Sequence, residues 1–276
     1  MTADPYAGAA TRWATEASLV YTPAVAHLVH RCPHPLAGHL VLDAGAGTGA
    51  ATEPLVEQGA RPIAVDRSPD MLSWRAGERP PAAVADVRAL PFRDATFDDV
   101  LAAFVLNHLT DPAAGLVELA RVTRPGGAVL AAVYGTGNRS ALRDRVDDTA
   151  SRAGWMPPEW YLRLKADAVP LIGTAARMTD IATGAGLCRI EVEERPVDVG
   201  IHRPEQLVNY RLGQAPFARW LDTIGPCRAD EVRRAAITAV APDMSPYRPV
   251  VVLLVAHTRE NPSGEEPRMD DAALPP

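Results

Sequence analysis

Short apolar runs alternate with amphipathic stretches through the first half of the chain. Runs of this length, bounded by glycine, proline or acidic residues, predict buried strands at 40–42, 62–66, 82–86, 100–106 and 128–134. Apolar residues at helical spacing predict helices between some of them, at 50–58 and 112–122. Strands that alternate with crossover helices predict an α/β fold with at least four parallel strands.

The pattern changes in the second half. Residues 136–173 are rich in Arg, Asp, Trp and Pro and interrupt the alternation. A helix at 175–185 and a strand at 188–199 resume it, and a last strand is predicted at 250–256. Residues 200–249 are mostly helical, with helices predicted at 204–213, 217–224 and 228–240. The two segments that interrupt the alternation are therefore predicted to be insertions at the ligand-bearing end of the sheet.

The first strand leads into a turn with glycines at alternate positions, Gly45, Gly47 and Gly49. Each glycine permits a positive φ or a close backbone approach that a Cβ would prevent. A strand, a glycine-rich turn and a helix form a nucleotide-binding unit, because the N-terminus of the helix offers unpaired N–H groups to a ligand. A tight turn without a ligand is the alternative, although packing alone rarely requires three such glycines.

Two ligand classes fit this turn. A dinucleotide site has the pattern G-x-G-x-x-G/A, which Gly45, Gly47 and Ala50 satisfy. An S-adenosylmethionine site has an acid before G-x-G-x-G, which Asp43 and the three glycines satisfy. Asp43 would repel a pyrophosphate, whereas a zwitterionic amino acid that carries a sulfonium would accept it. The turn therefore favours S-adenosylmethionine over NAD(P).

Two more acidic residues follow predicted strands. Asp66 lies about 20 residues after the glycines, where a carboxylate can accept hydrogen bonds from both ribose hydroxyls. Both candidate cofactors use such an acid, so Asp66 supports a nucleoside without choosing between them, and a solvated turn aspartate is the alternative. Asp86 ends the third strand, where a dehydrogenase fingerprint requires no acid. Ser68 and Pro69 predict the start of a helix.

These motifs, together with the segment from Leu90 to Asp98 and the turn Arg124-Pro-Gly-Gly127, resemble the class I S-adenosylmethionine-dependent methyltransferases of the small-molecule type. The resemblance is strongest over residues 36–135 and weaker over 174–258. It implies an α/β fold with a Rossmann-like, doubly wound, mostly parallel seven-stranded sheet, an antiparallel last strand and helical cap insertions. It also implies S-adenosyl-L-methionine as cofactor, S-adenosyl-L-homocysteine as product and a small-molecule acceptor, for example in natural-product biosynthesis.

The resemblance also assigns cofactor contacts. It implies that Asp86 accepts the adenine amino hydrogen, that the backbone N–H of Val87 faces the ring, and that a side chain near Met71 packs on it. Phe104 is expected near the methionine part of the cofactor. Arg67 is expected to contact the cofactor, and the alternative is that it is a solvated residue beside the site. The complete set of expected cofactor residues is Asp43, Gly45, Gly47, Thr48, Gly49, Asp66, Arg67, Met71, Asp86, Val87, Phe104 and Tyr21.

The same resemblance divides the chain. It gives a helical lid at 1–35 and a cofactor-binding core at 36–135, 174–199 and 250–258. Two caps, at 136–173 and 200–249, interrupt the core. A polar, proline-rich tail at 259–276 is predicted to be disordered. The caps and lid are expected to build the acceptor pocket from aromatic residues, namely Trp13, Trp155, Trp160, Tyr161, Tyr210 and Phe217. The alternative is that the aromatic residues of the caps form a small core of their own.

His108 follows the fourth predicted strand, at the edge where α/β sheets bind ligands. Imidazole titrates near neutral pH, so His108 is the candidate catalytic base for an oxygen acceptor. The resembling family frequently has a histidine here that only contacts the cofactor or supports the pocket, and both roles stay open. An amine or activated-carbon acceptor needs no base.

Composition and charge limit the kinds of partner that the chain is expected to bind. The 276 residues carry a net charge of −6, which gives no global basic field to attract nucleic acid or an anionic membrane. The sequence has neither an apolar run of 18 residues nor a signal-peptide pattern. Its three scattered cysteines fit a reducing, cytoplasmic setting. Neither the oligomeric state nor the identity of the acceptor follows from the sequence.

No short metal-binding motif is present, so no metal is expected. One run of charged residues predicts an exposed helix with ion pairs within the helix: Arg139, Arg143, Asp144, Arg145, Asp147 and Asp148. The favoured hypothesis is a small-molecule methyltransferase. A non-methylating S-adenosylmethionine-binding protein, such as a cyclase or a binding module, is the first alternative, and an NAD(P)-dependent oxidoreductase is a weaker one.

Overall fold

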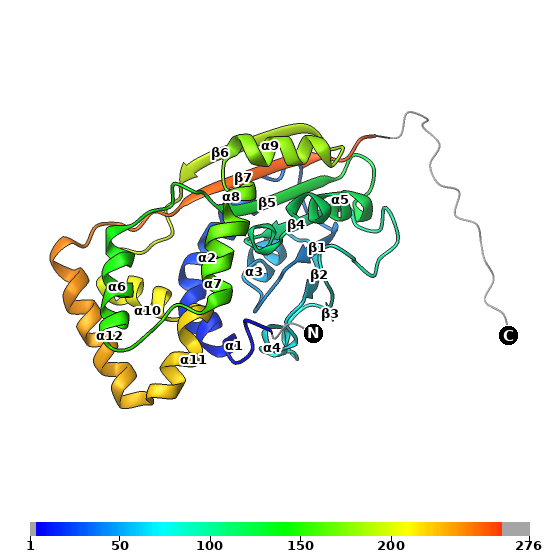
Figure 1. The fold of residues 1–276 in the computed structure, drawn as a ribbon. Helices are drawn as coiled ribbons and strands as arrows, with labels where there is room; N and C mark the ends of the chain where they lie inside the picture. The colour runs from blue at the N-terminus through cyan, green and yellow to red at the C-terminus, as the bar shows by residue number, and fades with distance from the viewer. Residues whose placement is uncertain (1–3, 261–276) are drawn as a thin grey trace.

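The computed structural model describes residues 4–260, and it contains one mixed seven-stranded sheet within that range. The strand order is β3-β2-β1-β4-β5-β7-β6 (Figure 1). The bounds are β1 Leu40–Ala44, β2 Arg61–Asp66, β3 Ala82–Val84, β4 Asp99–Ala103, β5 Ala128–Tyr134, β6 Cys188–Pro196 and β7 Val250–His257. Strands β1 to β5 are parallel, and β7 is antiparallel to both β5 and β6. The predicted fold class, including the antiparallel last strand, is confirmed.

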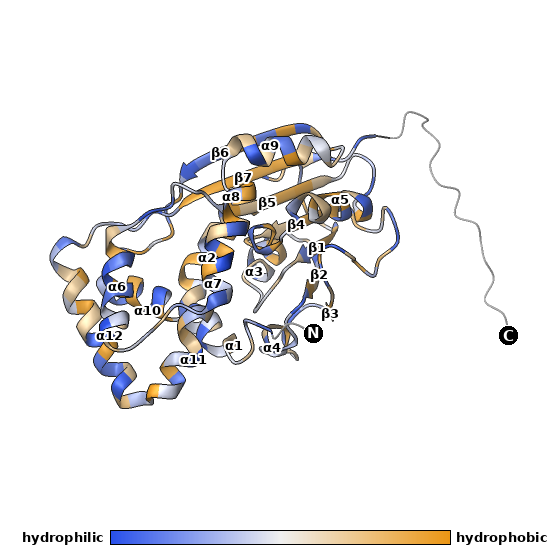
Figure 2. Cartoon of the chain, in the orientation of Figure 1, coloured by the Kyte–Doolittle hydropathy of each residue, from blue (hydrophilic) through white to orange (hydrophobic). Residues whose placement is uncertain are grey.

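The two faces of the sheet bury alternate residues of the same strands, as the side-chain period of two requires. On β5, Leu130 and Ala132 belong to one core cluster, and Val129, Ala131 and Val133 belong to the other. Helices α2 (Ser18–Val29) and α3 (Thr52–Glu57) contribute to the first cluster, and α5 (Pro112–Val122) and α9 (Ala175–Gly184) to the second. Figure 2 shows the apolar character of β4, β5 and β7, which both layers cover.

Of the remaining α-helices, α1 lies in the N-terminal region, α4 lies between β2 and β3, and the others lie within 136–173 and 200–249. The cap helices α6, α10, α11 and α12 lie at one end of the sheet, on the left of Figure 1. Their apolar faces continue the first core cluster, so the cap is packed against the sheet domain by the same core. The bounds are α1 Ala10–Arg12, α4 Pro69–Ser73, α6 Ala141–Arg152, α7 Glu159–Arg163, α8 Val169–Ile172, α10 Pro204–Leu212, α11 Ala215–Ile224 and α12 Pro226–Val240.

Two helix starts illustrate how local sequence fixes these elements. The Ser68 hydroxyl accepts a hydrogen bond from the Met71 N–H at the start of α4, and the Asp111 carboxylate accepts one from the Ala114 N–H at the start of α5. Each cap is followed by a proline, whose missing N–H costs nothing in the first turn. The predicted range of α5 is confirmed residue for residue.

Several predicted bounds are wrong in ways that concern the site. The fourth strand was expected to reach residue 106, but β4 ends at Ala103, because Phe104 has a φ of +58° and leaves the strand conformation. A short 3-10 helix, Leu106–His108, follows. The third strand ends two residues early, at Val84. The predicted helix at 50–58 begins only at Thr52, because the glycine-rich turn extends up to it.

The charged run in α6 was predicted to form ion pairs within its own helix, and this is wrong. Arg145 pairs with Asp243, and Asp147 pairs with Arg211 at 2.6 Å. Both contacts join α6 to other parts of the cap, because α12 and α10 pack against it. Among residues 4–260, no helix combines the length and the apolar character that crossing a membrane demands. Of the predicted disordered tail, 261–276 lies outside the described residues.

Candidate functional site

The glycine-rich turn lies at the carboxyl end of β1 and has a backbone that only glycine adopts readily. Gly45, Gly47 and Gly49 have φ values of +77°, +54° and +100°. A Cβ on Gly45 would lie 2.5 Å from the Cβ of Val105, in the segment after β4. The turn and the end of β4 are therefore in contact, and the missing side chain leaves room beside the sheet edge.

A cavity of about 510 Å³ opens above this turn. Asp66, at the end of β2, lies in its wall and accepts hydrogen bonds from the N–H groups of Gly47 and Ser68, both at 2.8 Å. Its pKa is raised by burial and lowered in part by these two bonds. Most of the expected cofactor residues line this cavity, namely Asp43, Gly45, Gly47, Asp66, Arg67, Met71, Asp86, Val87, Phe104 and Tyr21, whereas Thr48 and Gly49 do not.

Asp43 is the most unusual group in this cavity. The residue is only 2% exposed, and its Oδ2 atom has no hydrogen-bond partner among residues 4–260. Burial raises the pKa of the carboxyl to about 7, against the attraction of Arg79. Arg79 itself donates to the carbonyl oxygens of Gly47 and Leu72 at 3.2 and 3.0 Å, so it supports the turn from behind. The cavity thus contains a buried acceptor that lacks a donor.

Asp86 lies in the wall of the same cavity but is already paired. Its two oxygens accept from the Arg88 guanidinium at 3.0 and 2.7 Å, and this pair lowers the pKa of the carboxyl. The pair is partly exposed, so its contribution to stability is small. A carboxylate has about four acceptor positions, so Asp86 keeps capacity for an additional donor. Val87 is buried beside it.

A second cavity, of about 600 Å³, lies between the cap and the end of β5. The two cavities share one wall, formed by Tyr6, Trp13, Tyr21, Phe104, His108, Trp160 and Leu164. Within this wall, Trp13 stacks on Tyr21 with ring centres 4.7 Å apart, and Phe104 meets Tyr21 edge to face at 5.2 Å. Phe104 has the positive φ described above, and strained backbone of this kind clusters at functional sites.

His108 projects into the shared wall. The Tyr6 hydroxyl lies 3.3 Å from its Nε2 atom and 3.5 Å from its Nδ1 atom. Burial, followed by the positive charge of Arg67, lowers the pKa of His108 to about 4. The imidazole is therefore neutral near pH 7 and has one unprotonated nitrogen that can accept a proton. Both roles considered from the sequence, base and pocket residue, are compatible with this position.

The aromatic residues expected in the acceptor pocket separate into two groups. Trp13, Trp160 and Tyr161 line the second cavity. By contrast, Trp155 stacks on Phe217 with ring centres 4.1 Å apart and donates its indole N–H to the Pro216 carbonyl oxygen. These two residues and Tyr210 are buried in the first core cluster and line neither cavity. These three residues therefore do not line the pocket, and they belong to the core that the caps share with the sheet, not to a separate core of the caps.

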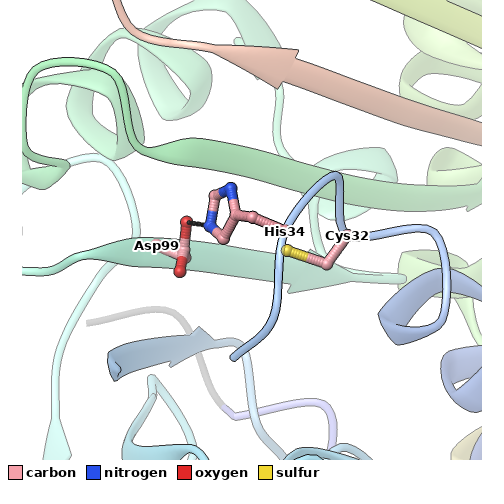
Figure 3. Close-up of side chains that lie close together, drawn as sticks. All are labelled: Cys32, His34 and Asp99. Atoms are coloured by element: carbon pink, nitrogen blue, oxygen red, sulfur yellow. Dashed lines mark hydrogen bonds and ion pairs between the residues drawn. The ribbon is translucent and has the colours of Figure 1, made fainter. Parts of the chain in front are cut away.

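A cluster of potential metal ligands lies where β4 begins, at the opposite end of that strand from the two cavities (Figure 3). One ligand atom from each of Cys32, His34 and Asp99 lies within 4.8 Å of the others. The fully buried Asp99 accepts from His34 Nε2 at 2.8 Å, from His39 Nδ1 at 2.7 Å and from the Ala128 N–H at 2.8 Å. Three donors thus account for the buried carboxylate. Cys32 and His34 are two residues apart, but Asp99 lies 65 residues after His34, so no local motif revealed the cluster.

Sequence reasoning also missed residues that belong to no motif. Asp4 lines the first cavity and accepts from the Ser68 hydroxyl at 2.6 Å. Arg143 and Lys165 line the second cavity, and Arg79 supports the turn. The position of each residue relative to the cavities depends on contacts between segments that are distant in sequence. The only available signal was the charged run that contains Arg143, and that signal was misinterpreted.

Comparisons with known proteins agree on the kind of domain. The family model described as "Methyltransferase domain" matches residues 42–131. A demethylmenaquinone methyltransferase of Mycolicibacterium paratuberculosis is 35% identical over 156 residues, which cover 54% of this chain and 67% of that protein. One of Corynebacterium urealyticum is 46% identical over 99 residues, or 36% of this chain and 43% of that protein. The match to this second relative therefore spans less than half of its length.

Solved structures share the fold at low sequence identity. The phosphoethanolamine N-methyltransferase 2 of Haemonchus contortus, in complex with S-adenosyl-L-methionine, superimposes with a TM-score of 0.56 and 20% identity. The superposition covers 86% of this chain and 52% of that protein. At this identity the likeness supports the fold of the chain and nothing about its acceptor.

Proposed function

The chain belongs to the class I S-adenosylmethionine-dependent methyltransferases, and from this premise we propose that it transfers a methyl group from S-adenosyl-L-methionine to a small-molecule acceptor. The cofactor would occupy the cavity above the glycine-rich turn, and the acceptor would occupy the cavity beneath the cap. The observation that carries this proposal is the wall of seven side chains that the two cavities share.

The residues of the first cavity fit the cofactor chemically. The unpaired Oδ2 atom of Asp43 offers an acceptor to the α-ammonium group, which would also stabilise the ionised carboxylate. Asp66 would bind the ribose hydroxyls, while it continues to accept from the Gly47 N–H. Asp86 and Val87 would contact the adenine, and Met71 would pack against it. These contacts leave the sulfonium end of the cofactor at the shared wall.

The cofactor supplies an activated methyl group, so the protein's contribution is chiefly position and exclusion of water. Tyr21 and Phe104 separate the two cavities with apolar ring surface and would hold the acceptor in line with the methyl group. For an oxygen acceptor, the neutral His108 imidazole would take the hydroxyl proton as the oxygen attacks. The Tyr6 hydroxyl would keep the imidazole ring in place.

The first experiment measures cofactor binding by calorimetry, with S-adenosylhomocysteine, NAD and NADP titrated into the full chain. Binding of S-adenosylhomocysteine alone supports the proposal, and binding of a nicotinamide nucleotide alone rejects it. Turnover of S-adenosylmethionine is then followed with candidate acceptors. Demethylmenaquinone, for which the relatives are named, is the first, and natural-product precursors follow. Cofactor binding without turnover on any acceptor would instead favour a non-methylating member of the fold.

A further inference from the structure

The second cavity has an unbalanced set of charges. Its wall contains four basic and two acidic residues, namely Arg139, Arg143, Lys165, Arg211, Asp144 and Asp147. Arg211 donates to the two oxygens of Asp147 at 2.7 and 2.6 Å, so these two charges cancel. Three cations then face one remaining carboxylate, that of Asp144. The cavity therefore has an excess of positive charge although the whole chain has a net charge of −6.

Of the three cations left in this wall, Arg143 is the one that is partly buried, whereas Arg139 and Lys165 are exposed. It forms no ion pair within residues 4–260, and its Nε atom is buried there without a hydrogen-bond partner. One Nη atom donates to the Asn138 carbonyl oxygen, and the guanidinium lies 5.7 Å from the centre of the Tyr247 ring. A partly buried cation without a counter-charge is less favourable than a paired one. An anion entering the cavity would supply the missing charge to the guanidinium.

The rest of the wall is aromatic. Tyr134 lies next to Phe104, with ring centres 4.7 Å apart, and Trp160 next to Tyr161 at 5.8 Å. Aromatic walls suit either a flat ring or an organic cation. Lys165 already lies 5.1 Å from the centre of the Tyr161 ring, which leaves that face occupied by a protein cation. The excess of positive charge therefore selects a flat ring over a cation.

On the premise of the methyl transfer proposed above, we propose that the acceptor is an aromatic compound with a carboxylate, and that this carboxylate pairs with Arg143. The planar guanidinium matches a carboxylate through two parallel hydrogen bonds. The reacting atom would then lie at the shared wall, next to His108, with the ring against Tyr134. Arg143 becomes the residue that selects acceptors by charge, at a distance from the methyl group.

The test compares three probes of one shape and different charge: naphthalene-2-carboxylate, naphthalene-2-carboxamide and 2-naphthylmethylammonium. Each is titrated by calorimetry into the wild-type full chain, with and without saturating S-adenosylhomocysteine. The carboxylate should bind about tenfold more tightly than the carboxamide, a ratio typical of one charged pair in a partly buried site. Equal affinities, a preference for the ammonium probe, or no binding of the carboxylate at about 1 mM would overturn the proposal.

Variants then identify the residue. Arg143→Met should abolish the preference for the carboxylate, and Arg143→Lys should retain part of it. Arg145→Met is the matched control, because Arg145 lies on the same helix, pairs with Asp243 and does not line the cavity. If Arg143→Met does not fold in a thermal scan, Arg143→Gln, which is also neutral, takes its place. A preference that survives undiminished in a neutral Arg143 variant overturns the assignment.

The two proposals fail in different ways. Failure of S-adenosylhomocysteine to bind would reject the methyl-transfer proposal, whereas the preference among the probes is measured in its absence as well. Conversely, normal binding of S-adenosylhomocysteine with no preference among the probes would reject only the assignment of the acceptor. Arg143 lies outside the first cavity, so its variants should bind S-adenosylhomocysteine with wild-type affinity.

Discussion

The hydroxyl of Tyr6 lies 3.3 Å from Nε2 of His108, a residue 102 positions later in the chain. This contact fastens the N-terminal segment to the end of β4, at the wall that both cavities share. Burial raises the pKa of Tyr6 and lowers that of His108, so both groups are neutral near pH 7. The neutral imidazole can take a proton from an acceptor molecule if Tyr6 accepts its N–H instead of donating to its free nitrogen, and its pKa of about 4 makes it a weak base at pH 7.

For an oxygen acceptor, we expect His108→Ala to lower kcat at least about a hundredfold, because a positioned base contributes that much. Because the pKa of His108 is about 4, the wild-type rate should not fall through protonation of His108 between pH 6 and 8. Steady-state kinetics over this range, once an acceptor is identified, provides the measurement. A loss of only a fewfold would make His108 a pocket residue. Tyr6→Phe, which keeps the ring, should cost far less than His108→Ala.

Asp43 should have opposite effects on stability and on cofactor binding. Burial raises its folded-state pKa to about 7, above the value of about 3.9 in unfolded chains. The folded state therefore binds this proton more tightly, and the stabilising contribution present below pH 4 is lost as the pH rises towards 7. In the absence of cofactor, Asp43→Asn should raise the free energy of unfolding at pH 8 by about 1–3 kcal/mol, as measured by urea denaturation.

Cofactor binding should respond to Asp43 in the opposite direction. An ammonium group prefers the ionised carboxylate, so the affinity for S-adenosylhomocysteine should rise as the pH increases from 6 to 8. Asp43→Asn should weaken binding at pH 8 and remove the part of the pH dependence that comes from Asp43. Calorimetry at several pH values tests both statements. An Asn variant that is more stable and also binds as well as the wild type would contradict the assigned contact.

Features that depend on neighbouring residues were predicted from the sequence, and features that depend on contacts between distant segments were not. The strand at 128–134 and the helix at 112–122 were predicted with the observed bounds, because burial and caps are written into neighbouring residues. Contacts between distant segments carry no such signal. Asp147 pairs with Arg211 at a separation of 64 residues, and its local charge pattern suggested an intrahelical pair instead. Trp155 likewise packs against Phe217, although its sequence context suggested a pocket wall.

Gly45 offers a test of the glycine-rich turn itself. Its φ is +77°, and an added Cβ would lie 2.5 Å from the Cβ of Val105. Gly45→Ala should therefore destabilise the fold by about 1–3 kcal/mol through strain and overlap. It should also weaken S-adenosylhomocysteine binding by closing the space beside the turn. Gly154→Ala is the control, since its φ is also positive but no atom lies within 4 Å of the added Cβ. Equal losses in the two variants would attribute the effect to φ alone.

Asp99 is predicted to affect the stability of the fold without affecting ligand binding in the two cavities. Its carboxylate is fully buried at the start of β4 and accepts from His34, His39 and the Ala128 N–H. Asp99→Asn replaces one acceptor oxygen by an NH₂ group that faces a donor, which should cost about 2–4 kcal/mol of unfolding free energy. Asp94→Asn removes a carboxylate that is 79% exposed and should change stability by less than about 1 kcal/mol.

This loss should leave the cofactor affinity of the folded protein unchanged, because Asp99 lies at the opposite end of β4 from the first cavity. Urea denaturation and calorimetry on the same samples separate stability from cofactor affinity.

Addition of Zn²⁺ before denaturation tests whether the cluster binds a metal, since Cys32, His34 and Asp99 are residue types that bind this ion. A ligand that binds only the folded state raises its stability. A rise with Zn²⁺ in the wild type but not in Asp99→Asn would show that the cluster binds a metal as well as hydrogen-bonding internally. The absence of such a rise would leave hydrogen bonding as its only role.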